Sequence, residues 1–192
     1  MKGNLYIISS VAGGGKSTLI SRILNKHPEI LFSVSCTSRP IRPGEKDGVN
    51  YHFKSRSEFE ELISKDYFYE WALVHDNYYG TPKDFILSNL KQNRKIILDI
   101  DVQGAASLRK SFPAECFTVF VSPPNLEILE QRLRQRATDS EESIQKRLRN
   151  ARKEMGEAPR FDCIIINDEL ERAYQELKNT VGTQLRKIQG NV

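Results

Sequence analysis

The fold of this chain is decided by one stretch near its start, Asn4-Leu-Tyr-Ile-Ile-Ser-Ser-Val-Ala-Gly-Gly-Gly-Lys-Ser-Thr-Leu-Ile20. The apolar run from Leu5 to Ile8 predicts a short buried strand, and the segment from Ser10 to Gly15 is a loop that only small residues could follow. From Lys16 onward the apolar residues recur at helical spacing. A strand, a small-residue loop and then Lys-Ser-Thr opening a helix is the context typical of a phosphate-binding loop, or P-loop.

The chemistry expected of this loop follows from its backbone. Successive N–H groups and the N-terminus of a helix form a nest that binds anions. Lys16 would add a positive charge toward the outer phosphates of ATP, and the hydroxyl of Ser17 would be a ligand for Mg²⁺. The predicted ATP-binding residues in this stretch are Ser10, Val11, Ala12, Gly13, Gly14, Gly15, Lys16, Ser17 and Thr18.

One position departs from the usual pattern. The P-loop consensus that ends at Gly15-Lys16-Ser17 has glycine where this chain has Ser10. Gly13 and Gly14 supply extra freedom inside the loop, so a close approach of backbone to phosphate is still expected. The alternative is an ordinary strand-to-helix turn with a capping serine.

Length and composition place limits on the class of protein. A chain of 192 residues with 39% hydrophobic residues suits one compact α/β unit with small inserted lobes. The net charge of +4 is mild and requires neither a nucleic acid nor a membrane as partner. No apolar run reaches membrane-spanning length. Cys36, Cys116 and Cys163 lack metal-ligand spacing and indicate reduced thiols in a cytoplasmic protein.

The rest of the chain predicts a mainly parallel sheet flanked by helices. Apolar strands are expected at residues 95–101, 117–121 and 163–166, with helices at about 126–136, 141–154 and 170–187 between and after them. Continuous apolar strands that alternate with helices are typical of a sheet covered on both faces. We expect a single domain over 1–192, with a core of about 1–34, 82–134 and 151–192, a small β-rich insert at about 35–81 and a helical lid at about 135–150.

Within the insert, the sequence gives four local expectations. Leu31 to Cys36 alternates as one strand, Ser57-x-x-Glu60 has the form of a capping box, and Asn77-Tyr-Tyr-Gly80 has the form of a turn. Thr81-Pro82 before Asp84 predicts a helix start with proline at the first helical position.

The insert carries a second group of chemically suggestive residues. Arg39-x-x-Arg42-x-x-Glu45 is followed by Tyr51 and Tyr79. Two guanidinium forks and two phenols suit a compact phosphate dianion, because arginine forks bind phosphate oxygens in pairs. The alternative is a solvated charged loop.

Three carboxylates are further candidates. Glu70 lies among aromatic residues shortly before Thr81, and it either reads a purine edge or faces water on an edge strand. Asp99 and Asp101 close the strand at 95–101, and ligands of open α/β sheets lie beyond the carboxyl ends of strands. Asp99 is therefore a candidate for contact with Mg²⁺ through water or with the acceptor. Asp101 is either a site residue or the cap of the following helix.

The last candidates are arginines near the predicted lid. Arg132 and Arg136 are four residues apart and share one face of a helix, and Arg147 lies on the next helix. Rows of arginine on helices are usually solvated. Next to a phosphate-binding loop they gain a function, because phosphoryl transfer needs cations around the migrating group.

Taken together, these stretches resemble guanylate kinase over nearly the whole chain. The matching segments include Phe32-Ser-Val-Ser through Glu45, Gly48-x-x-Tyr51, Glu70-Trp-Ala, Asn77-Tyr-Tyr-Gly80 and Ile97-Leu-Asp-Ile-Asp-x-Gln-Gly104. Arg132-Leu-x-x-Arg136, Glu141 through Leu148 and Ile166-Asn-Asp168 match as well. Thr81 stands where the family often has serine, which keeps the hydroxyl.

The resemblance implies a P-loop NTPase-type fold and a role for each matching position. The GMP phosphate site would comprise Ser35, Arg39, Arg42, Tyr51 and Tyr79, with Glu45 beside the two arginines. Glu70, Thr81 and Asp101 would read guanine, and Asp99 would lie near GMP and the metal. Asn167 would contact the adenine side of ATP. The implied catalytic residues are Lys16, Arg39, Asp99, Arg132, Arg136 and Arg147.

The implied reaction is ATP + GMP = ADP + GDP, with Mg²⁺ as cofactor and dGMP as a further acceptor. The acceptor oxygen belongs to a phosphate that is largely ionised at neutral pH, so no strong general base is required. Two alternatives remain at this point. One is a catalytically inactive module that binds phosphorylated proteins at Arg39, Arg42 and Tyr51. The other is a related P-loop kinase with a different phosphorylated acceptor, which Glu70 and Thr81 disfavour.

Overall fold

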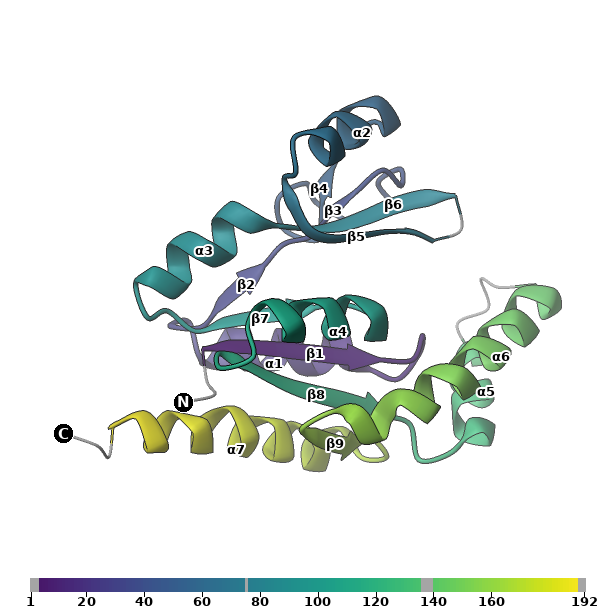
Figure 1. Ribbon diagram of the computed structural model, residues 1–192. Helices are drawn as coiled ribbons and strands as arrows, with labels where there is room; N and C mark the ends of the chain where they lie inside the picture. The colour runs from purple at the N-terminus through teal and green to yellow at the C-terminus, as the bar shows by residue number, and fades with distance from the viewer. Residues whose placement is uncertain (1–3, 75, 136–139, 190–192) are drawn as a thin grey trace.

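The computed structural model describes residues 4–74, 76–135 and 140–189, with side chains described as far as residue 182. Its centre is a parallel sheet of five strands in the order β2-β7-β1-β8-β9 (Figure 1). The strands are β1 (Leu5–Ser10), β2 (Leu31–Ser33), β7 (Ile96–Asp99), β8 (Cys116–Ser122) and β9 (Cys163–Ile166). The expectation of a mainly parallel sheet is confirmed.

Alternate residues of β1 belong to two different layers of the core. Tyr6 and Ile8 pack against α1 (Lys16–Lys26) and α7 (Leu170–Gln189) on one face of the sheet. Leu5 and Ile7 pack against α3 (Lys83–Lys91) and α4 (Val102–Ser111) on the other face. All four side chains are fully buried, which is why this strand is continuously apolar.

Two more helices cover the carboxyl end of the sheet. These are α5 (Leu126–Gln135) and α6 (Glu141–Glu157), and a 3₁₀ turn, η1 (Ala158–Arg160), follows α6. Leu129 and Leu133 of α5 pack with Ile144 and Ala151 of α6 and with Phe120 of β8. This cluster seats α6 beside the loop that follows β1.

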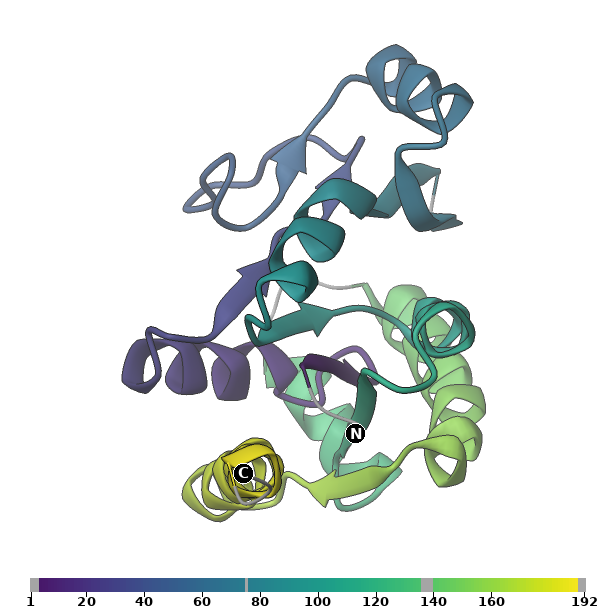
Figure 2. The same cartoon turned by 60° about the vertical axis from the view of Figure 1, so that its left-hand side comes forward.

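The insert forms a second sheet in the order β4-β3-β6-β5, made of β3 (Cys36–Thr37), β4 (His52–Phe53), β5 (Phe68–Val74) and β6 (Asn77–Pro82). Helix α2 (Arg56–Ser64) covers it through a small core of Cys36, Phe59 and Phe68. In both views α2 lies at the opposite end of the molecule from α7 (Figure 1, Figure 2).

Two local expectations in this region, one on a strand and one on a turn, were wrong. The run Leu31–Cys36 is divided between two sheets, because β2 pairs with β7 whereas β3 pairs with β4 and β6. Asn77–Gly80 is part of strand β6, and the chain reverses before it, at Asp76 with φ 64°. Local alternation could not reveal either result, since it does not identify the partner of a strand.

The two helices expected here, α2 and α3, are present, but the residues that begin them differ from the predicted ones. The capping box of α2 uses Ser55, whose hydroxyl accepts from Glu58 N at 3.2 Å while the Glu58 carboxylate accepts from Ser55 N at 2.6 Å. It therefore lies two residues before the predicted pair. Pro82 is the N-cap of α3 rather than its first helical residue. Serine and glutamate recur at the same spacing in Ser55–Glu60, so the motif alone does not fix the register.

The loop after β1 folds back against the ends of β8 and β9. Ser10 is the last residue of β1, and its hydroxyl donates to Val121 O at 2.7 Å. Gly13 and Gly15 take φ values of 93° and 91°, which favour glycine. A Cβ on Gly14 would lie 2.0 Å from Ser10 Oγ, 3.2 Å from Val11 O and 3.3 Å from Val121 O. The Ser10 side chain thus occupies the space that a side chain at position 14 would need.

No helix within residues 4–74, 76–135 and 140–189 is both long enough and apolar enough to cross a membrane.

The packing of Ser10 against Gly14 predicts that alanine at position 14 is poorly tolerated. Gly14→Ala should lower the free energy of unfolding by about 1–3 kcal/mol, because the new methyl group overpacks a site bounded by backbone oxygens. Ser10→Gly should recover part of that loss, with a coupling of about 0.5–3 kcal/mol in a double-mutant cycle measured by urea unfolding.

The matched control is Gly156→Ala in α6, where a Cβ meets nothing within 4 Å. The free energy of unfolding of this variant should be higher by about 0.4–1 kcal/mol, since alanine restricts the unfolded chain and favours the helix. A gain of the same size from Gly14→Ala would contradict the packing argument.

Candidate active site

Two hollows meet at the carboxyl ends of β1 and β7. The first, of about 330 Å³, is lined by Ser10, Val11, Ala12, Gly13, Gly15, Lys16, Ser17, Thr18 and Glu154. The second, of about 240 Å³, reaches to the insert and is lined by Ser10, Lys16, Ser35, Tyr51, Glu70, Ala72, Val74, Tyr79, Gly80, Asp99, Ile100 and Asp101. Ser10 and Lys16 line both, so a group bound in one hollow lies next to a group bound in the other.

Lys16 is the charged residue at the junction. It begins α1, directly after the left-handed Gly15, and its ammonium forms an ion pair with Asp99 at the end of β7. It also donates to Ile100 O at 3.3 Å. Strand order explains the pairing, because β7 lies next to β1 and both strands end at the same edge of the sheet. The structure therefore places Asp99 on Lys16, within the second hollow.

Asn167 and Arg132 support the loop from behind. The buried amide of Asn167 donates to Gly14 O at 2.8 Å, and its backbone N–H donates to Ser122 O at 2.7 Å. Arg132 in turn donates to Asn167 O at 2.8 Å. A Cβ on Gly15 would come within 2.1 Å of the Asn167 amide nitrogen. In this arrangement both predicted site residues hold the backbone of the P-loop in place.

Glu70 is the half-buried carboxylate whose shifted pKa marks the second hollow. It accepts from the Thr81 hydroxyl at 2.5 Å, across the pairing of β5 with β6. Burial raises the pKa of the Glu70 carboxyl, and the negative charge of Asp101 adds to the rise, while the Thr81 hydrogen bond opposes it. A carboxylate held in this way can accept from two donors on the edge of a planar base.

Gly104 allows helix α4 to approach Glu70, a role that the sequence did not reveal. A Cβ at this position would lie 3.1 Å from the Glu70 carboxyl group. Asp101, which also lines the second hollow, is the N-cap of α4 and accepts from Gly104 N at 2.8 Å. The capping alternative for Asp101 is thus confirmed, and the residue still borders the pocket.

Arg39 is preorganised by Glu45. Its two terminal nitrogens donate to the two carboxylate oxygens at 3.0 and 2.7 Å, and one of them also donates to Pro40 O at 2.7 Å. Arg39 as a residue is 8% exposed, and its guanidinium carbon lies 5.5 Å from the ring centroid of Tyr51. This pair raises the pKa of Arg39 and lowers the pKa of Glu45.

The remaining residues predicted for the acceptor phosphate lie around this pair. Tyr51 and Tyr79 are 5.9 Å apart between ring centroids and line the second hollow with Ser35. Burial raises the pKa of Tyr51 to about 12, so its hydroxyl stays protonated. The side chain of Arg42 is exposed, while its backbone N–H donates to Glu45 at 2.8 Å.

Of the three predicted lid arginines, the structure describes Arg132, which lies behind the loop, and Arg147. Arg136 lies outside the described residues. Arg147 lines a separate hollow at the start of α6, with Ser140, Glu142, Ser143 and Lys146, and is not among the residues that line the two central hollows.

Sequence reasoning missed Glu154, which belongs to α6 and lines the first hollow. Burial raises the pKa of the Glu154 carboxyl; the charge of Asp101 adds to the rise and that of Lys16 opposes it. A signal was available, because Glu154 lies seven residues after Arg147, two helical turns along the same face.

The residues at the P-loop suit a magnesium ion that is held mainly by a nucleotide. The hydroxyl of Ser17, with the carboxylates of Asp99 and Glu154 nearby, offers oxygen ligands, which Mg²⁺ prefers. In the described parts of the chain, no group of three or more His, Cys, Asp or Glu side chains is arranged to hold a metal by itself. Magnesium at nucleotide sites usually keeps several waters and few protein ligands.

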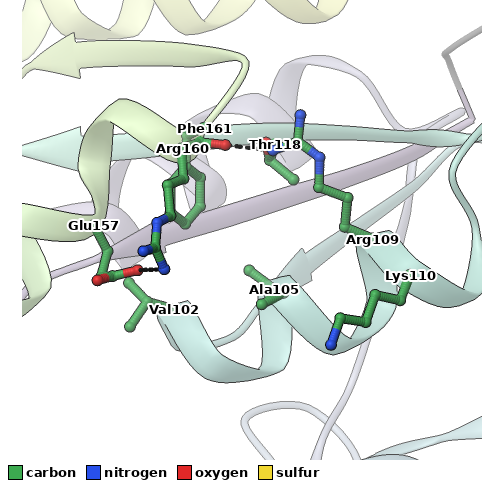
Figure 3. A pocket seen from close by; sticks show the side chains of 9 residues that line it. Val102, Ala105, Arg109, Lys110, Thr118, Glu157, Arg160 and Phe161 are labelled. Carbon is green, nitrogen blue, oxygen red and sulfur yellow. Dashed lines mark hydrogen bonds and ion pairs between the residues drawn. The ribbon is translucent and has the colours of Figure 1, made fainter.

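A further cavity of about 310 Å³ lies away from the P-loop, between α4, β8 and the end of α6. Val102, Ala105 and Phe161 form an apolar wall, and Lys110 lies at one end (Figure 3). At the other end Glu157 pairs with Arg160 at 2.5 Å (Figure 3). None of these residues lines either central hollow.

Comparison with known proteins gives one consistent family. The family model described as guanylate kinase matches residues 2–184. A guanylate kinase of Synechococcus sp. (strain JA-3-3Ab) is 47% identical, over 92% of this chain and 81% of the relative. A guanylate kinase of Prochlorococcus marinus (strain NATL2A) is 42% identical, over 95% of this chain and 98% of the relative.

The solved structures agree with the sequence relatives. The crystal structure of guanylate kinase from Anaplasma phagocytophilum superimposes with a TM-score of 0.78 at 30% identity, and the match covers 95% of this chain and 86% of that chain. The loop after β1, the second sheet with its half-buried carboxylate and these matches lead to the same conclusion: this chain belongs to the guanylate kinase family.

Proposed function

We propose that this chain transfers the terminal phosphoryl group of ATP to GMP, giving ADP and GDP, and that it takes dGMP as well. The observation that carries the proposal is the pair of adjoining hollows that share Ser10 and Lys16. One is lined by the P-loop, and the other holds the half-buried carboxylate of Glu70, which suits guanine. Membership of the guanylate kinase family supports the same reaction.

On the donor side, the backbone of residues 10–18 would bind the phosphates of ATP, with the Ser17 hydroxyl directed at Mg²⁺. Asn167 supports this role by fixing Gly14 O, which keeps the neighbouring N–H groups oriented before ATP arrives. When bound, Mg²⁺ supplies positive charge between the phosphate groups.

On the acceptor side, Glu70 would accept hydrogen bonds from N1–H and the N2 amino group of guanine, with Thr81 and Asp101 beside it. Arg39, Arg42, Tyr51, Tyr79 and Ser35 would bind the GMP phosphate. Glu45 holds the Arg39 fork in place, so little side-chain entropy remains to be lost when the phosphate binds.

The chemical step would need positioning and positive charge rather than a strong base. The attacking phosphate oxygen is largely deprotonated at neutral pH, because its second pKa is about 6. Lys16, together with Arg132, Arg136 and Arg147, would neutralise charge on the migrating phosphoryl group, with Asp99 orienting Lys16. The division into a core, an insert at about 35–81 and a lid at about 135–150 is part of this proposal, because closure over the substrates would keep water from ATP.

We place the reaction in the cytoplasm, as part of purine nucleotide metabolism. Cys36, Cys116 and Cys163 form no disulfide with one another, which suits a reducing compartment. Nucleic acid and membrane are not part of the proposed function.

The role of Lys16 predicts a loss of turnover. Lys16→Met should lower kcat for GMP phosphorylation by a factor on the order of 10² or more, because contacts of this kind reach 10³ to 10⁵ in phosphoryl transfer. Coupled detection of ADP release measures this. The control is Lys110→Met, since Lys110 lies in the distant cavity, and it should retain normal turnover. Near-normal turnover of Lys16→Met would contradict the loop assignment.

The role of Glu70 predicts the choice of base. AMP should be a very poor acceptor in the wild type, by about 10⁴ to 10⁵ in kcat/KM, because adenine presents a lone pair where guanine presents N1–H. Glu70→Gln should cut kcat/KM for GMP at least about tenfold, as a charge-assisted pair is weakened. Thr81→Val removes the hydroxyl that donates to Glu70 but keeps the carboxylate that faces the base, so it should have a smaller effect. Unchanged preference in Glu70→Gln would place base recognition elsewhere.

The charge of Glu70 should also lower the stability of the folded chain at neutral pH, which gives a readout that does not depend on activity. Burial raises the pKa of this carboxyl in the folded chain, so the folded chain binds the proton more tightly than the unfolded chain does. Stability from this group is therefore present below the unfolded pKa and is lost as pH rises through the folded pKa. Glu70→Gln should raise the midpoint of thermal unfolding at pH 7 relative to wild type, and the difference should vanish below about pH 4. A lower midpoint at pH 7 would contradict this account.

A further inference from the structure

Glu154 is an unexpected residue at a site that must accept phosphate. All other described residues that line the first hollow belong to the loop and first helical turn at 10–18, and they offer backbone N–H groups, hydroxyls and the Lys16 ammonium. Glu154 alone comes from another element, α6, and it brings a carboxylate. Two like charges 4 Å apart repel by about 4 kcal/mol at an effective dielectric constant of 20. A carboxylate facing bare phosphates would therefore oppose nucleotide binding.

The cations of the site are already engaged with other groups. Lys16 pairs with Asp99 and donates to Ile100 O. Arg132 donates to Asn167 O behind the loop. A carboxylate at this position becomes favourable only where a further positive charge or a hydrogen-bond donor lies between it and the phosphates.

Mg²⁺, the proposed cofactor, would supply the positive charge, and its bound waters would supply the hydrogen-bond donors. Magnesium at nucleotide sites keeps most of its waters, and those waters donate strongly to nearby carboxylates. The described residues contain no ready-made cluster of acids for the metal, so its protein contacts there would be Ser17 and acceptors for its waters.

We propose that Glu154 is a positioning residue that accepts hydrogen bonds from the water shell of magnesium-bound nucleotide and disfavours nucleotide that lacks the metal. It would thereby make nucleotide binding depend on Mg²⁺ more strongly than the Ser17 contact alone, because Ser17 does not repel nucleotide that lacks the metal. The inference rests on the ATP site of the proposed function and is independent of the identity of the acceptor.

The test compares two glutamates of the same helix. Glu154 and Glu157 are both half-buried on α6, but Glu157 pairs with Arg160 beside the distant cavity (Figure 3). Dissociation constants for the non-hydrolysable ATP analogue AMPPNP are measured by calorimetry, once with excess Mg²⁺ and once with EDTA, in wild type, Glu154→Gln and Glu157→Gln. No GMP is present, so the readout is binding and not turnover.

The expected result is a change in the ratio of the AMPPNP dissociation constant measured with EDTA to the one measured with Mg²⁺. In Glu154→Gln, metal-free AMPPNP should bind more tightly than in wild type and magnesium-bound AMPPNP more weakly. The preference for the metal-bound form should fall about tenfold or more, because loss of an outer-shell partner typically costs 10–100-fold in metal affinity. Glu157→Gln should keep the wild-type ratio within about twofold.

Either of two results for Glu154→Gln would overturn the inference about this residue. An unchanged ratio in Glu154→Gln, with a normal unfolding midpoint, would show that this carboxylate does not face the metal. Weaker binding of metal-free AMPPNP would show that Glu154 supports the loop or Lys16 instead. A wild-type chain that binds no AMPPNP would overturn the proposed ATP site itself, whereas normal AMPPNP binding without GMP phosphorylation would overturn only the proposed reaction.

Discussion

The site depends on one constraint, the close contact between the loop backbone after β1 and the ends of β8 and β9. The Asn167 amide donates to Gly14 O, and the Ser10 hydroxyl donates to Val121 O. Neither contact would fit if Gly14 or Gly15 carried a side chain. Because the loop is held in this way, its N–H groups are oriented before any ligand binds, and the cost of ordering them is met during folding. The same contact explains Ser10, whose hydroxyl uses the space that Gly14 leaves.

Charge at the site is arranged in pairs. The pair of Lys16 on α1 with Asp99 on β7 joins two elements, whereas Arg39 and Glu45 pair within one loop of the insert. In such a pair the carboxylate holds the cation in position and partly neutralises its charge. This arrangement suits a site at which an anionic ligand binds next to the cation. Glu70 and Glu154 differ, because burial raises the pKa of both. Carboxylates kept at this cost are typical of functional positions.

Sequence reasoning succeeded where a motif is local and failed where its register or partner is distant. The strand, loop and helix at residues 5–26 and the capping alternative for Asp101 depend on short stretches, and the parallel sheet was predicted from apolar strands that alternate with helices. The split of Leu31–Cys36 between two sheets and the strand at Asn77–Pro82 depend on pairings with residues far along the chain. Gly104 escaped notice because its neighbour Glu70 is distant in sequence, although glycine on a helix face is itself a sign of close packing.

By itself, the sequence determined that an apolar strand is followed by a glycine-rich loop and a helix, and in what order the carboxylates and arginines of the proposed site occur along the chain. These features are local, because strand formation, positive φ at glycine and the anion nest each need only a few consecutive residues. Only the tertiary structure decided which charges meet. It placed Lys16 on Asp99, Arg132 on Asn167 and Glu154 beside the P-loop. Those contacts join elements that lie up to about 140 residues apart, and they are fixed by the order of strands in the sheet and by the packing of α5 and α6 over its carboxyl end.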